Sequence, residues 1–300
     1  MPSSEQGTYI TGLHRWTLRP RRWLRGTART LRGNPNMMIG FIILTVAVTM
    51  AIFAPLLTTH EGIRTDPYQR LESPASETWF GTDHLGRGVY ERTIFGSRIS
   101  LLVGFSVAVI VTVFGLAIGL VTGYYRTLDN IVMRVMDGLM SFPSLLLALA
   151  LIAVLGASIQ NVLIAISVVQ TPRMVRLVRG SVLFLREQMY VDAARAMGAP
   201  VWRILLWHIA PNTMAPIMVQ ATFVFALAII TEANLSFLGA GVPPRTPTWG
   251  NIMGQGRTFL TIAPWIVIFP GVLLALTVMA INLVGDGLRD ALDPRLRRRM

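Results

Sequence analysis

Long apolar stretches separated by short polar segments run along most of the chain. A helix that spans the hydrocarbon core of a bilayer needs about 20 mostly apolar residues. Six stretches approach or exceed that length, and the fourth is the weakest because it stops being apolar at Gln170. The pattern predicts an all-α integral membrane protein with about six transmembrane helices, at about 37–57, 99–124, 130–155, from 159 onward, 216–235 and 262–284.

Small and polar residues inside these stretches predict how the helices pack. The second contains three glycines at four-residue spacing, which places them on one helix face where backbones can approach closely in lipid: Gly115, Gly119 and Gly123. In the third, Arg134 and Asp137 stand three residues apart and are expected to pair with each other. Pro143 then interrupts the third stretch and predicts a kink.

The arginines predict the orientation in the membrane. All 27 basic residues are arginine, and with the N-terminus inside, twenty of them fall in the inner segments. Cytoplasmic loops carry the excess of positive charge, so both termini are expected in the cytoplasm. The first apolar stretch is too long for a signal peptide and lacks a small-residue cleavage site, which predicts an uncleaved helix. We expect Arg173, Arg176 and Arg179 to anchor at anionic headgroups.

Composition excludes several functions. The chain is 53% hydrophobic and 14% charged, with a mean hydropathy of +0.55, whereas soluble domains carry about 25% charged residues. It has no cysteine, its four histidines lie far apart, and no GxSxG or HExxH motif is present. Without lysine it cannot form a Walker A loop, so any ATP must be hydrolysed by another subunit. We therefore predict no enzyme activity and no cofactor, and the +12 charge beside apolar segments does not indicate nucleic-acid binding.

Two connecting segments are unusually long, 58–98 outside and 173–207 inside, and loops of that length often carry function. In the inner one, Tyr190, Val191, Ala194 and Met197 form an apolar helix face. Gly198 suits a left-handed cap and Pro200 the first turn of a new helix. The pattern predicts two short helices joined by an elbow. They either dock on another protein or lie on lipid headgroups.

Asp192-Ala193-Ala194, then Gly198, then His208 to Asn212 resemble the EAA loop of ABC importer permeases. In that family the loop forms coupling helices that fit a groove on the ATP-hydrolysing subunit. The resemblance implies a type I ABC importer permease fold, with aspartate here replacing the usual glutamate. The residues it assigns to ATPase coupling are Tyr190, Asp192, Ala193, Ala194 and Gly198.

Three further motifs are similar to the C-type permease subunits of dipeptide, oligopeptide and nickel importers: 81–87 with 96–101, 235–244 with 249–251, and 282–294. Gly88 departs from the family, which usually has aspartate there. The resemblance implies a non-catalytic permease in the bacterial inner membrane. Its implied partners are a second permease, two ATP-binding subunits and an extracytoplasmic solute-binding protein. Peptides are the expected cargo, with nickel, glutathione and opines as alternatives.

The predicted organisation has four parts: a basic cytoplasmic tail (1–35), a first span with a long outer loop (36–98), a core permease domain with its coupling loop at 186–207 (99–290), and a second basic tail (291–300).

Three more residues are candidates. Asp83 and Arg87 are expected either to contact the binding protein or to shape the outer face. Glu232 lies late in the fifth span, where a charge at mid-bilayer costs about 2.5–3.5 kcal/mol; it either lines the pathway or pairs with groups near the outer interface. A stand-alone secondary transporter would need its own coupling acids, and Glu232 alone is weak support for that alternative.

Overall fold

The computed structural model describes residues 34–58 and 64–292. The arginine-rich segment before residue 34 and the last eight residues, on which part of the charge prediction rests, lie outside these ranges. Within the described residues the structure is helical, and its one β-type pairing is an isolated bridge between Thr82 and Gly88. The predicted all-α class is confirmed.

Five helices are long and apolar enough to cross a membrane, and the number is six if a bent pair counts as one span. The five are α2, α4, α7, α10 and α12, and the bent pair is α5 with α6. The bounds of the helices are α2 Pro35–Ile52, α3 Ala54–Leu57, α4 Val89–Tyr124, α5 Arg126–Met140, α6 Ser144–Leu155, α7 Ile159–Leu185, α8 Met189–Ala196, α9 Val201–Arg203, α10 Ala210–Phe237, α11 Trp249–Gly256 and α12 Trp265–Leu292.

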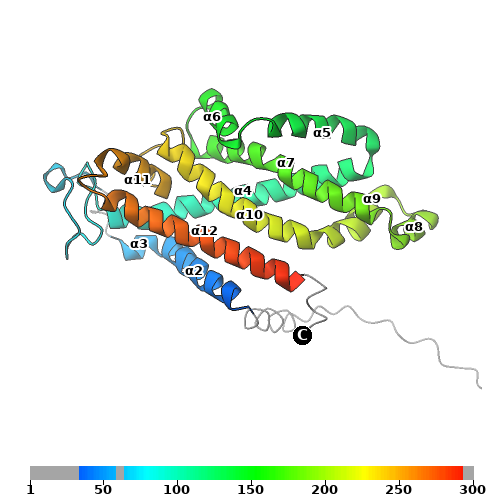
Figure 1. Cartoon of the computed structure of the whole chain (residues 1–300), viewed down its shortest axis with the longest axis horizontal. Helices are drawn as coiled ribbons and strands as arrows, with labels where there is room; N and C mark the ends of the chain where they lie inside the picture. Colours follow the sequence, from blue (N-terminus) through cyan, green and yellow to red (C-terminus); the bar gives the residue numbers. More distant parts are fainter. Residues whose placement is uncertain (1–33, 59–63, 293–300) are drawn as a thin grey trace, which may run out of the picture.

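The long helices lie side by side along the longest axis of the molecule (Figure 1). Helices α8 and α9 lie at one end, called here the α8 end, and α11 lies with the 64–88 loop at the other, the α11 end. The start of α2 meets the last turns of α12, where the Asn34 Nδ2 donates to the Asp290 Oδ2 at 3.1 Å. The two ends of the described chain therefore lie together.

Helices α4 and α7 pack through the predicted glycine stripe. A Cβ atom built on any of these glycines would lie only 2.3–2.6 Å from a side chain of α7. The helices therefore approach closely because the glycines have no side chain, and the packing prediction is confirmed. The pairs are Gly115 with Met174, Gly119 with Val178 and Gly123 with Val182.

The third span is bent more strongly than the kink predicted at Pro143. α5 and α6 meet at 94° across residues 141–143, because Pro143 cannot continue a helix from the preceding residue. α4 begins at Val89 and so crosses the predicted boundary at residues 98 and 99. The second helix of the inner loop is not separate either: α9 continues through a π-helix, Ile204–Ile209, into α10.

The predicted pair between Arg134 and Asp137 is wrong. Asp137 instead accepts from Arg176 of α7 at 2.7 Å. Arg179 donates to both carboxylate oxygens of Asp129 of α5, through its Nε and through its Nη2, the latter at 2.7 Å. Arg176 and Arg179 are therefore engaged by carboxylates of α5, and the expected role as free headgroup anchors does not describe them.

Candidate functional site

The α8 elbow has the geometry that the sequence predicts. Gly198 follows α8 with φ at +76°, a backbone region that favours glycine. The Gly198 N–H donates to the Arg195 carbonyl at 2.9 Å, and the Ala199 N–H donates to the Ala194 carbonyl at 3.0 Å. This pair of bonds is the Schellman motif, which ends α8 sharply.

Helix α8 is divided between a buried and an exposed side. Val191 and Ala194 are buried in the main hydrophobic core. Asp192 and Ala193 are exposed, and Asp192 accepts from Arg195 at 3.2 Å. Tyr190, expected on the apolar face, is 41% exposed, and its hydroxyl lies 3.5 Å from the Asn212 amide nitrogen. Of the five predicted coupling residues, Ala194 alone is buried.

Large apolar side chains are exposed around this elbow. Soluble surfaces rarely gather such residues unless a partner covers them. We call this group the α8 patch, and its members are Met189 (88% exposed), Met197 (82%), Trp202 (60%) and Trp207 (70%).

The buried side of α8 is joined to a spanning helix. Val191 and Ala194 belong to the same core cluster as Ile204 and Ile209 of the π-helix, and the π-helix runs directly into α10. π-helical turns inside helices are frequent at functional sites. Helix α8 is therefore connected to α10 through packed side chains and a continuous backbone.

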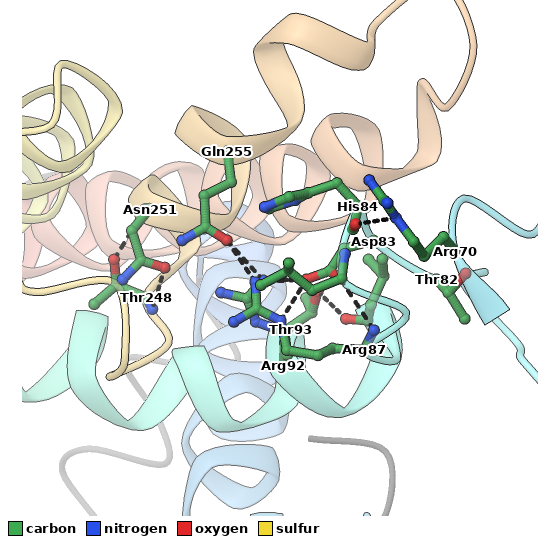
Figure 2. A network of polar contacts seen from close by, with 12 residues as sticks. Arg70, Thr82, Asp83, His84, Arg87, Arg92, Thr93, Thr248, Asn251 and Gln255 are labelled. Carbon is green, nitrogen blue, oxygen red and sulfur yellow. Dashed lines mark hydrogen bonds and ion pairs between the residues drawn. The ribbon is translucent and has the colours of Figure 1, made fainter. Parts of the chain in front are cut away.

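At the α11 end, Asp83 is the centre of a polar network (Figure 2). Its side chain is fully buried. Its Oδ2 accepts from the Arg87 Nε at 2.8 Å and from the Arg92 Nη1 at 2.6 Å. Its Oδ1 accepts the backbone N–H groups of Leu85 and Arg87 at 2.8 and 3.0 Å. The carboxylate thus ties the 64–88 loop to the first turn of α4.

Gln255 of α11 completes the network. Its Oε1 accepts from Arg87 at 2.8 Å and from Arg92 at 2.9 Å. Burial alone would raise the pKa of Asp83, but Arg92, Arg87 and the two backbone N–H groups together lower it below 3.8. Asp83 therefore holds the loop, α4 and α11 together as a carboxylate.

Sequence reasoning missed Arg92 and Gln255. The predicted outer segment 58–98 includes Arg92, whereas the residue is 2% exposed inside α4. The available signal is its position, nine residues after Asp83 and seven before the apolar stretch that begins at residue 99. No local signal indicates Gln255, because its partners lie more than 160 residues earlier in the chain.

Glu232 is fully buried between α10, α4 and the segment before α11. Its Oε1 accepts from the Ser236 hydroxyl at 2.7 Å, and its Oε2 lies 3.4 Å from the Ser100 hydroxyl. The Ser100 oxygen also accepts the Trp249 N–H at 3.3 Å. The carboxylate thus lies inside this chain and is not on its surface.

Helix α11 is fitted closely against α10. Thr248 and Asn251 form a reciprocal capping box at its start, and the indole N–H of Trp249 donates to the Thr93 carbonyl at 3.0 Å. A Cβ on Gly250 would lie 2.5 Å from the Cα of Ala233. The predicted motif at 249–251 is therefore a packing motif between α11, α10 and α4.

Known proteins match most of the chain. The family model described as "Binding-protein-dependent transport system inner membrane component" matches residues 112–298, and that of the "N-terminal TM domain of oligopeptide transport permease C" matches residues 22–74. The dipeptide transport system permease protein DppC of Alkalihalophilus pseudofirmus is 46% identical over 91% of this chain and 90% of its own length. The oligopeptide transport system permease protein OppC of Bacillus subtilis is 41% identical, over 89% of this chain and 88% of its own.

A solved structure shows the same fold. One chain of the MetNI methionine ABC transporter in an inward-facing conformation is similar with a TM-score of 0.54 at 21% identity, over 67% of this chain and 97% of that one. With two family models, curated permeases and this fold in agreement, the chain belongs to the family of binding-protein-dependent transport system inner membrane components, as a multi-pass permease subunit of an ABC importer.

Proposed function

We propose that this chain forms half of the translocation pathway of an ATP-driven importer of dipeptides or oligopeptides. Its partners in this proposal are a second permease, two ATP-binding subunits and an extracytoplasmic solute-binding protein. Two of the relatives are named as dipeptide and oligopeptide permeases. A third, from Pectobacterium atrosepticum, is a glutathione permease at 41% identity over 92% of both chains, and glutathione is itself a tripeptide.

The observation that carries the proposal is the α8 patch. It gathers large apolar side chains on an elbow that turns at Gly198 and is joined to α10. A patch of this kind fits a groove on another protein. In the proposal, ATP binding closes the ATPase subunits, α8 moves with them, and α10 follows because the two share one core cluster.

The proposed orientation puts the α8 end in the cytoplasm. Arg186, Arg195 and Arg203 lie at that end, after α7 and in α8 and α9, which agrees with the positive-inside rule. The start of α2 and the end of α12 lie together, so both termini would be cytoplasmic. The α11 end then faces the binding protein, with Asp83 and Arg87 shaping the face it meets. We assign Glu232 a structural role, because its carboxylate is buried against Ser236 and Ser100.

The test is purification of the tagged chain from its native membrane, followed by uptake in proteoliposomes. The proposal expects a second permease and Walker-motif ATPases to co-purify. It also expects uptake of a dipeptide that stops when ATP is omitted or a non-hydrolysable analogue replaces it. A chain that purifies alone and transports on an ion gradient without ATP would support a secondary transporter instead.

A further inference from the structure

Helices α5 and α7 carry a row of charges on one face. From the α8 end toward the bend of the third span, Arg179 binds Asp129 and Arg176 binds Asp137. The next arginine of α7 in the same direction is Arg173. No carboxylate of the described residues lies within 4.0 Å of its side-chain nitrogens. The row thus consists of two ion pairs and a third cation, Arg173, that has no carboxylate partner among the described residues.

The depth of this row follows from the packing of α4 on α7. Residues 99–124 of α4 carry no charge, with Arg98 before them and Arg126 after them at the start of α5. Because Gly115 of α4 lies against Met174, Arg173 is level with about Phe114. At a rise of 1.5 Å per residue, this level lies about 24 Å from that of Arg98 and about 18 Å from that of Arg126. Arg173 is therefore close to mid-membrane.

Arg173 is exposed on the surface of this chain. The neighbouring pair is exposed too, with Arg176 at 48% and Asp137 at 62%. A charged side chain that faces lipid at this depth is costly, and such residues instead face a water-filled cavity or the interior of a bundle. The face made by α5 and α7 is therefore a polar surface inside the membrane.

Arg173 lines a cavity of about 370 Å³ at the bend between α5 and α6. Ser141 and Ser144 also line it. α6 begins at Ser144 without a side-chain cap, so the N–H groups of its first turn have no helical partner. Figure 1 shows α5 alongside α7 and α6 leaving it at a steep angle, and the cavity lies at this bend.

We propose that Arg173, with the start of α6 and the two serines, binds the carboxylate of a peptide in transit. A guanidinium group and helix N-terminal N–H groups both favour a carboxylate. The cargo would supply the acid that the third position of the row lacks. This subsite rests on the proposed function, since it names the part of a peptide that this chain contacts.

The first test does not depend on cargo. The chain has no cysteine, so Ser141→Cys gives it a single thiol beside Arg173. In membrane vesicles holding the whole transporter, this thiol is reacted with a sulfonate-bearing and a trimethylammonium-bearing methanethiosulfonate. We expect both to react, the anionic one faster, and Arg173→Gln to lower the anionic-to-cationic rate ratio on the order of tenfold. Arg134→Gln, an exposed arginine outside the cavity, is the matched control and should leave the ratio unchanged.

The second test uses peptides. Proteoliposomes with the complete transporter take up alanyl-alanine or its C-terminal amide, each presented by the same loaded binding protein. The preference of the binding protein cancels when variants are compared. Arg173→Gln should lower uptake of the free acid on the order of tenfold relative to the amide, and Arg173→Lys should restore part of it.

The outcomes separate the two proposals. A thiol at residue 141 that neither reagent reaches, or a rate ratio insensitive to Arg173, overturns the subsite while peptide uptake continues. An Arg173→Gln effect equal for both peptides and dependent on anionic lipid in the vesicle assigns Arg173 to a lipid headgroup and overturns it as well. Failure of the unmutated transporter to import either peptide overturns the proposed function, and with it the peptide as occupant.

Discussion

The two ends of the bundle are built in opposite ways. At the α11 end, charged and polar side chains are buried, with Asp83 fully enclosed and Arg92 2% exposed. At the α8 end, large apolar side chains are exposed, including Met189 at 88% and Met197 at 82%. Buried ions must be paired within the chain, so the charges buried at the α11 end are neutralised without a partner. Exposed apolar side chains gain free energy when a partner covers them, so the α8 end is incomplete without one.

The largest expected effect is at the α11 end. Asp83→Asn leaves Arg92 buried without its carboxylate, and breaking a buried pair costs about 3–5 kcal/mol. Thermal unfolding of the purified protein in detergent should show a large fall in Tm. The matched control is Asp192→Asn at the α8 end, where the pair with Arg195 is exposed and contributes less than about 1 kcal/mol. Equal falls in Tm for Asp83→Asn and Asp192→Asn would contradict the claim that the ion pairs of the α11 end are buried and those of the α8 end are not.

Gly198→Asp should lower stability less than Asp83→Asn does. It should, however, have a larger effect on the coupling between peptide transport and ATP hydrolysis. Because φ at Gly198 is positive, any side chain placed there costs about 1–2 kcal/mol. Gly239 has φ at +84° with open space around it at the other end, so Gly239→Asp introduces a similar strain. Both variants should unfold at similar temperatures, whereas Gly198→Asp alone should lose peptide-stimulated ATP hydrolysis. Loss of that activity in both would mean that strain, and not position, is responsible.

The smallest expected effect is on pH dependence. Burial lowers the pKa of His84 below 6.5. Below pH about 6.5 the unfolded chain therefore binds more protons at this histidine than the folded one, and stability falls as pH decreases toward the folded-state pKa. Asp83 contributes no slope there, because its pKa lies below 3.8. Unfolding midpoints measured between pH 7.5 and 5.5 should fall less in His84→Gln; identical slopes would exclude this histidine as the cause.

Periodicity and glycine spacing predicted the parts of the fold that depend on local chemistry. The close packing at the glycines of α4 and the helix cap at Gly198 are each decided by a few neighbouring residues. The start of α4 was placed ten residues too late, because Arg92 was assigned to the loop. An arginine enters a helix at that depth only when a carboxylate from elsewhere neutralises it.

The misassigned partners have the same cause. Asp137 was paired with Arg134 by spacing, but its partner is Arg176, 39 residues away on α7. Gln255 binds Arg87 and Arg92, which lie more than 160 residues earlier in the chain. These pairings follow from which helices become neighbours, which the positions of apolar residues along a single chain do not specify.

The central claim is that α8 contacts the ATP-binding subunit. It is tested most directly by cross-linking from a single thiol introduced into the cysteine-free chain. Ala193→Cys puts the thiol on the exposed side of α8, and Glu77→Cys puts one at an exposed position of the α11 end. With a short thiol-to-amine reagent in native membranes, we predict that residue 193 cross-links to an ATP-binding subunit and that residue 77 does not. Cross-linking of the ATPase to residue 77, or to neither position, would contradict the assignment of α8 as the coupling helix.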